Sequence, residues 1–319
     1  MNLPLPDPST VSGLVETEAE AAVVDAPVAG SPGGTPPVDM RAERRQARRE
    51  RMRLLLRRPG FIVGSALLLF WLVCAIGGDR ITPFDPINDF ELPNTRPGAD
   101  HVMGTDQLGR DVLSRVMAGA RDVLIAAPAA AVVSVAVGTF LGLLMGYYRG
   151  WIDEVLGRII EALLSIPVVL VGLLIVSSLG ASRIVVAGAV AVLFTPIVTR
   201  TVRAAVIAEA QLDYITSARL RGESGLFVMT REILPNVSGA IVVEFTVRIG
   251  YAVFTIATLT FLGAGIQPPS PDWGLQISDT YRLIQAGHWW PTLFPAMAIA
   301  SLVIATNLVA DSIETVSAA

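Results

Sequence analysis

The stretch TSARLRGESGLFVMTREILPN, residues 216–236, carries five ionised side chains and separates two long apolar runs, Ile184–Val202 and Ala240–Leu262. Each run approaches the roughly 20 apolar residues that an α-helix needs to cross about 30 Å of hydrocarbon. A charged segment between two such runs is typical of a loop that joins membrane-spanning helices. The pattern therefore predicts an all-α membrane protein.

The composition of the whole chain agrees with this prediction. Hydrophobic residues make up 52%, charged residues only 16%, and the mean hydropathy is +0.58. A soluble domain usually has about 25% charged residues. Four further apolar runs bring the expected spans to six: Phe61–Ile76, Val123–Tyr147, Ile159–Leu179 and Pro291–Val309. We expect a polytopic protein with six transmembrane helices, and no internal repeat indicates a secondary transporter.

The N-terminal region divides into two parts by composition. Residues 1–39 are rich in Pro, Ala, Gly, Ser and acidic residues, which predicts a disordered tail. Residues 40–59 are strongly basic, with nine arginines before Gly60. Such a run also fits nucleic-acid binding, but its place directly before an apolar run favours a cytoplasmic anchor at the membrane.

The arginines set the expected orientation. With both termini in the cytoplasm, 16 of the 24 fall on the cytoplasmic side, as the positive-inside rule requires. The membrane domain, residues 60–315, then has an extracytoplasmic loop at 78–121 and a cytoplasmic loop at 203–236.

Missing residue types exclude several functions. All 24 basic residues are arginine, so the chain cannot hold a phosphate-binding loop that uses a lysine. The single cysteine, Cys74, and the two histidines, His101 and His288, are far apart in the sequence. We therefore expect no metal, no cofactor and no catalytic centre of its own.

The cytoplasmic loop has an ordered pattern. Asp213 is placed to cap a short helix, and Gly222 is placed to end it, since glycine adopts the left-handed conformation easily. Leu226, Met229 and Ile233 then form one apolar face of a second helical turn. Further along, Pro235 suits the first turn of the next spanning helix.

Two interpretations of this loop remain open. It is either a solvated connection or a short helical unit that docks in a groove of a cytoplasmic partner. In the second case the small Ala218 would allow close approach, and Arg219, with Arg221 and Arg231, would pair with acidic groups.

Glu244 and Arg248 lie inside the fifth expected span, four residues apart. A charge in the middle of the bilayer costs roughly 2.5 to 3.5 kcal/mol on insertion scales, so neither should face lipid. They either pair with each other or line a translocation path, and the two roles are compatible.

The expected extracytoplasmic loops contain further candidates. Asp106, Arg110 and Asp111 have no nucleophile or histidine base at a catalytic spacing, so a loop braced by ion pairs is the favoured interpretation. Trp273, together with Trp289 and Trp290, suits the membrane interface, and a contact with a partner protein is the alternative.

The loop SARLRGESGLFVMTREILPN resembles the EAA loop of bacterial ABC importer permeases. Ala218, Gly222 and the run Ile233–Asn236 match its pattern, whereas Ser217 and Arg219 depart from its commonest forms. Three more segments, at 101–121, 146–167 and 261–274, are similar to permeases of the DppC/OppC type.

The resemblance implies the type I ABC importer permease fold and a subunit of the bacterial plasma (inner) membrane without its own catalysis. It implies three kinds of protein partner: a second permease of the DppB/OppB type, two ATP-binding subunits and an extracytoplasmic substrate-binding protein. It implies import of dipeptides or oligopeptides, with nickel or another small solute as the alternative. Contacts with the extracytoplasmic partner would fall on Asp106, Arg110, Asp111, Gln267 and Trp273. The residues that would couple to the ATPases are Ser217, Ala218, Arg219, Gly222, Leu226, Met229, Ile233, Leu234 and Pro235.

Two other classes of function fit the sequence less well. An ion-coupled transporter would need acidic sites in the middle of the membrane, and Glu244 is the only candidate. A membrane enzyme would need converging nucleophiles, bases or metal ligands, which two distant histidines do not supply.

Overall fold

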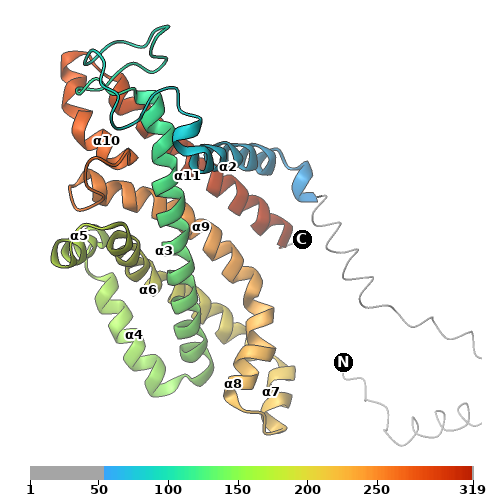
Figure 1. The fold of residues 1–319 in the computed structure, drawn as a ribbon. Coiled ribbons are helices and arrows are strands. Elements are labelled where there is room, and N and C mark those ends of the chain that lie inside the picture. Colours follow the sequence, from blue (N-terminus) through green and yellow to red (C-terminus); the bar gives the residue numbers. More distant parts are fainter. Residues whose placement is uncertain (1–53, 318–319) are drawn as a thin grey trace, which may run out of the picture. The chain divides into compact units, whose positions relative to one another are not determined.

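The structure, a computed structural model of the 319-residue chain, describes residues 54–317. Every regular element in this part is a helix, and it contains no β-strand (Figure 1). The expected all-α class is confirmed. The predicted tail, residues 1–39, and residues 40–53 of the basic segment lie outside the described residues.

Five helices among the described residues are long and apolar enough to cross a membrane. They are α2 (Pro59–Gly77), α3 (Val112–Tyr148), α6 (Arg183–Glu209), α9 (Leu234–Phe261) and α11 (Trp290–Ser317). Shorter elements lie in the connections: η2 (Gly78–Arg80), α7 (Asp213–Leu220), α8 (Gly225–Phe227), the π-helix η3 (Val228–Ile233), α10 (Trp273–Thr280) and η4 (Tyr281–Ala286).

The third expected span, Ile159–Leu179, is not one straight helix. Instead, α4 (Gly150–Leu164) and α5 (Val168–Leu179) meet at a bend of 89°. Pro167 explains the break, because it has no N–H for the helical ladder and its ring disfavours the helical conformation of Ile166. The described residues therefore hold five spans, or six if the bent pair counts as one.

The second span also begins earlier than expected. Asp111 caps α3 by accepting a hydrogen bond from the backbone N–H of Ser114 at 2.7 Å. The helix therefore begins at Val112, although the apolar run begins at Val123, and residues 112–121 of the expected loop are helical.

Close packing of α3 against α6 forms the centre of the bundle (Figure 1). Gly138, Gly142 and Gly146 repeat every fourth residue of α3, as the sequence shows. A Cβ atom at Gly142 would lie 2.8 Å from the Cβ of Val202, which is closer than real Cβ atoms approach. Small residues on one face thus allow the two backbones to approach each other. The helix α9 packs against both α3 and α6, and α2 packs against α11.

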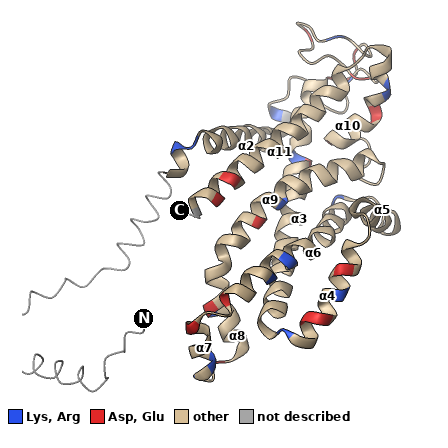
Figure 2. Ribbon diagram, turned by 180° about the vertical axis from the view of Figure 1, so that it is seen from behind, with Lys and Arg blue, Asp and Glu red and all other residues tan. Residues whose placement is uncertain are grey.

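Charged residues are unevenly distributed over the bundle. Figure 2 shows few of them along α2 and α3, and more on α4 and around α7 and α8. The short elements between α6 and α9 are thus one of several places where charged residues gather.

Candidate functional site

The segment between α6 and α9, residues 213–233, is called the helical loop below. Its first element, α7, ends in a Schellman motif. The N–H of Gly222 donates to the carbonyl of Arg219 at 3.0 Å, and the N–H of Glu223 donates to that of Ala218 at 3.3 Å. Gly222 has φ +78°, the left-handed conformation that this motif requires. Asp213 is not the cap, however, because Leu212 occupies that position and Asp213 is the first helical residue.

The rest of the helical loop runs into α9 without interruption. Ser224 caps α8 by accepting from the N–H of Phe227 at 3.3 Å, and η3 follows directly. Pro235 lies in the first turn of α9, as expected. Because Pro235 lacks an N–H, it donates no hydrogen bond to the carbonyl of Arg231, and the π-turn η3 lies just before it. Residues Gly225–Phe261 consequently form one long helical rod.

The π-turn changes which side chains of the helical loop are buried. Ile215, Ala218, Val228 and Ile233 are fully buried, and Met229 nearly so, in a cluster with valines of α6. Leu226 was expected on the same face as Met229 and Ile233, but it is exposed, because a π-turn has more residues per turn than an α-helix. Ala218 faces the core of its own chain, so its small size serves internal packing and not the approach of a partner.

The outer surface of the helical loop is apolar at its tip. Leu220 is 84% exposed, Leu226 67% and Phe227 44%. Ser217 is exposed on α7. Large apolar side chains grouped in one short segment are the usual mark of an interaction surface.

Two arginines of the helical loop contact residues of the same chain. Arg219 lies over the ring of Tyr147, 4.6 Å from its centroid, and Arg221 pairs with Glu223 at 2.6 Å. A Cβ at Gly225 would lie 2.8 Å from the hydroxyl of Tyr148, so α8 rests on the end of α3.

Tyr214 ties the helical loop to both neighbouring helices, although the sequence did not single it out. Its hydroxyl donates to Glu209 of α6 and accepts from Asn236 of α9 at 2.8 Å. Partial burial, together with the hydrogen bond to Glu209, raises the pKa of Tyr214 to about 12. The phenol therefore stays protonated, and α6, α7 and α9 are joined at one point.

Glu244 and Arg248 pair in the middle of α9. The Nε of Arg248 lies 2.7 Å from Oε1 of Glu244, and each side chain is 11% exposed. The guanidinium lies 5.2 Å from the ring centroid of Tyr251 and 5.6 Å from that of Phe194. The pairing expected from their spacing is present, and it avoids an isolated charge in the apolar part of the chain.

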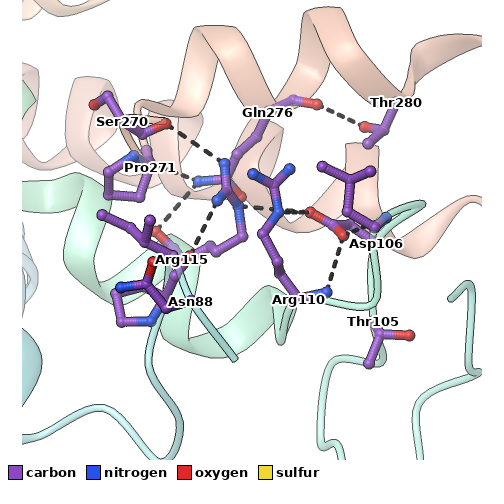
Figure 3. A network of polar contacts seen from close by, with 12 residues as sticks. Asn88, Thr105, Asp106, Arg110, Arg115, Ser270, Pro271, Gln276 and Thr280 are labelled. Carbon is purple, nitrogen blue, oxygen red and sulfur yellow. Dashed lines mark hydrogen bonds and ion pairs between the residues drawn. The ribbon is translucent and has the colours of Figure 1, made fainter. Parts of the chain in front are cut away.

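A buried polar network lies beside α10 (Figure 3), at the end of the bundle opposite the helical loop (Figure 1). Asp106 accepts from Nε of Arg110 at 2.8 Å and lies 3.7 Å from Nε of Arg115. Arg115 also donates to the carbonyl of Pro86 at 3.0 Å, and Gln276 of α10 donates to the carbonyl of Arg115 at 3.2 Å. The ion pairs expected in this segment therefore brace the loop before α3 against α10.

Burial limits what this network can offer to another protein. All three residues expected to contact a partner here are buried: Asp106, Arg110 and Asp111. The carboxylate of Asp111 already lies 2.9 Å from Nδ1 of His101 and accepts the hydrogen bond from the N–H of Ser114 that caps α3. The braced loop presents other side chains to its surroundings.

A second set of buried charges was missed in the sequence. Asp122 of α3 pairs with Arg183 of α6 at 2.9 Å and accepts from the hydroxyl of Ser270 at 2.6 Å. Asp272 caps α10 through the N–H of Leu275 at 3.0 Å, and its Oδ2 has no partner among the described residues. Burial and the nearby Asp122 raise the pKa of Asp272 to about 6. The order Pro-Asp before an apolar run was a cap signal that could have located α10.

Trp273 is neither an interface residue nor a contact for a partner. Its side chain is 0% exposed, its Nε1 donates to the carbonyl of Val116 at 2.8 Å, and its ring packs edge-on against Trp71 at 4.8 Å. A Cβ at Gly119 would collide with this ring, so the close fit fixes Trp273 in the core. Gln267, by contrast, is exposed and donates to the carbonyl of Gly265 at 3.1 Å.

Comparison with known proteins shows the family to which this chain belongs. Residues 138–318 match the family described as the binding-protein-dependent transport system inner membrane component. The chain belongs to this family. The match begins within α3 and includes the bent pair, α6, the helical loop, α9 and α11, so it contains the whole helical loop and the pair Glu244–Arg248.

Three individual relatives align with most of the length of this chain. It is 36% identical over 269 residues to the glutathione transport system permease protein GsiD of Pectobacterium atrosepticum, covering 83% of this chain and 89% of the relative. It is 36% identical over 262 residues to the dipeptide transport system permease protein DppC of Haemophilus influenzae, covering 80% and 88%. GsiD of Escherichia coli O157:H7 is 37% identical over 262 residues, covering 81% and 86%. The resemblance to ABC importer permeases of the DppC/OppC type is confirmed.

Proposed function

We propose that this chain is the permease subunit of an ATP-driven importer of small peptides, and that its helical loop docks on the ATPase subunits. The observation that carries the proposal is the exposed apolar tip formed by Leu220, Leu226 and Phe227. Water does not stabilise such a group of side chains, and a groove on a partner protein would bury it.

Contacts inside the chain support a mechanical role for the docked loop. The buried face of the helical loop packs against α6, α8 rests on Tyr148, and Tyr214 joins α6 to α9. Because α8, η3 and α9 form one continuous rod, a force on the tip reaches the pair Glu244–Arg248 in the middle of α9. Closure of the ATPases on ATP would tilt this rod and change access to the translocation path.

The proposal includes an orientation and a set of partners. The helical loop and both termini lie in the cytoplasm of a bacterial inner membrane, which agrees with the arginine-rich character of the segments placed there. A second permease subunit completes the path, and a binding protein delivers the substrate from outside. The names of the relatives, which refer to glutathione and dipeptides, favour small peptides as the substrate.

The docking surface can be tested by placing charges on the tip. A double variant, Leu220→Asp with Leu226→Asp, should lose the ATPase subunits during purification of the complex and should lower peptide uptake by about tenfold or more. Leu92→Asp, an exposed leucine in the loop before α3, is the matched control and should retain the ATPases. An ATPase pair bound to the double variant at wild-type stoichiometry would contradict the docking proposal.

A further inference from the structure

An open cavity of about 620 Å³ lies between α4 and α6, and none of its residues belongs to the helical loop. Its volume is within the range of roughly 300 to 1,000 Å³ that is usual for small-ligand sites. Six charged residues line it, three of each sign: Asp153, Glu154, Glu161, Arg158, Arg200 and Arg203. The cavity is therefore strongly polar but nearly neutral overall.

Four of these six charges are compensated within the chain. Arg203 binds Asp153 through two hydrogen bonds, Nε to Oδ1 at 2.5 Å and Nη2 to Oδ2 at 2.7 Å. Arg158 lies 3.9 Å from Glu154 at the exposed rim. The bidentate pair also links α4 to α6, the two helices that supply most of the cavity lining.

The remaining two charges, Glu161 and Arg200, have opposite signs and belong to the two different helices. In the part of the chain that the structure describes, neither side chain has a hydrogen bond or an ion pair. A second hollow of about 400 Å³, lined by Leu164, Ile197, Arg200 and Thr201, adjoins the first through Arg200. Leu164 is the last residue of α4, so this hollow lies beside the bend between α4 and α5.

We propose that this cavity binds a zwitterionic peptide, with Glu161 receiving the terminal ammonium group and Arg200 the terminal carboxylate. The inference rests on the proposed function and adds the site and the chemical groups that recognise the substrate. A guanidinium matches the geometry of a carboxylate, and a carboxylate accepts hydrogen bonds from an ammonium group. A neutral zwitterion satisfies both free charges at once, whereas a simple anion or cation would leave one of them unpaired.

Blocked peptides test the proposal directly. The complete complex, in nanodiscs without nucleotide and without the binding protein, is titrated with trialanine, N-acetyl-trialanine and trialanine amide. The wild-type complex should bind trialanine about tenfold more tightly than either blocked form. Glu161→Gln should weaken trialanine binding and abolish the discrimination against the N-acetyl form only. Arg200→Gln should abolish the discrimination against the amide only.

Two sets of variants control for folding and for general charge effects. Arg96→Gln and Glu314→Gln change exposed charges that do not line the cavity, and both should behave as the wild type. The exchange Glu161→Arg with Arg200→Glu keeps both charges and should restore trialanine binding to within a few-fold of the wild type. Restoration by the exchange would show that the single variants lose a charge partner and not their fold.

The outcomes separate this inference from the function on which it rests. Equal affinity of the wild type for all three peptides, or equal loss for all three in a single variant, would overturn the assignment of Glu161 and Arg200. Loss of the second permease subunit from both single variants would overturn it as well and would make this face a subunit interface. Uptake of trialanine in the presence of ATP and the binding protein is measured in parallel, and its absence in the wild type would refute the peptide importer itself.

Discussion

Arg248 holds Glu244 through a 2.7 Å contact between Nε and Oε1, one helical turn apart on α9. Removing one partner of a buried ion pair costs roughly 3 to 5 kcal/mol, because the other charge stays buried without compensation. We therefore expect Arg248→Leu to lower the amount of assembled complex in the membrane several-fold. Quantitative immunoblotting of the assembled complex measures this effect.

The double variant Glu244→Leu with Arg248→Leu separates the two roles of the pair. Replacement of both charges by apolar residues is often neutral for stability, so the double variant should assemble as the wild type does. If the pair lines the path, uptake by the assembled double variant should still fall. Wild-type uptake by Arg248→Leu alone would argue against both roles.

The left-handed backbone of Gly222 gives a second prediction. No atom lies within 4 Å of the position that a Cβ would take, so a larger side chain meets conformational strain and no steric clash. The left-handed conformation costs a residue other than glycine roughly 1 to 2 kcal/mol. We expect Gly222→Val to distort the end of α7, leave the complex assembled and uncouple ATP hydrolysis from uptake.

Asparagine supplies the matched control at this position, because it enters the left-handed region more readily than valine. Gly222→Asn should therefore keep most of the wild-type uptake per ATP hydrolysed. Reconstituted vesicles allow both rates to be measured in the same sample. Undiminished transport by Gly222→Val would count against a rigid helical loop.

The packing of α3 on α6 gives a third prediction. A methyl group at Gly142 would lie 2.8 Å from Val202, so Gly142→Ala must push the two helices apart. Overpacking of this kind typically costs about 1 to 3 kcal/mol. Gly239→Ala in α9 has open space around the new methyl group and should be neutral or stabilising by up to about 1 kcal/mol. The thermal unfolding midpoint of Gly142→Ala in nanodiscs should fall by several degrees, whereas that of Gly239→Ala should stay the same or rise.

The sequence predicted those features of the fold that depend on local composition. Apolar length located the spans, and the glycine at position 222 located the end of α7, because each signal lies within the segment that it describes. The bend at Pro167 was missed, since hydropathy averages over the break and does not record the missing N–H. The exposure of Leu226 was also missed, because a 3.6-residue period was assumed where the chain forms a π-turn.

Contacts between distant segments could not be read from local patterns. The ring of Trp273 lies 4.8 Å from that of Trp71, about 200 residues away in the sequence, and its Nε1 donates to the carbonyl of Val116 in α3, so contacts with distant segments bury it. Asp122 meets Ser270 for the same reason. From the sequence alone, a tryptophan near the end of a span or a single aspartate could be either exposed or buried. Tertiary packing decides which, and it is not visible in a local pattern.

The buried carboxyl of Asp272 gives the last prediction. Burial raises its pKa from 3.8 to about 6, with the nearby Asp122 as a further cause, while the hydrogen bond from the N–H of Leu275 and the charge of Arg183 act in the opposite direction. The folded protein therefore binds this proton more tightly than the unfolded chain does. As the pH rises from about 4 to above 6, the folded state must ionise a buried group, so the free energy of unfolding falls by up to about 3 kcal/mol.

Asp272→Asn should remove this loss, because the amide carries no charge and its oxygen can still accept the hydrogen bond from Leu275. We expect the variant to be more stable than the wild type at pH 7.5, with the difference shrinking toward pH 4.5. Thermal midpoints of the complex in nanodiscs at several pH values measure the effect, and Asp100→Asn, an exposed aspartate, controls for the change in net charge. A variant that is less stable than the wild type at pH 7.5 would show that the ionised carboxylate contributes favourably to the fold, through the α10 cap or through Arg183.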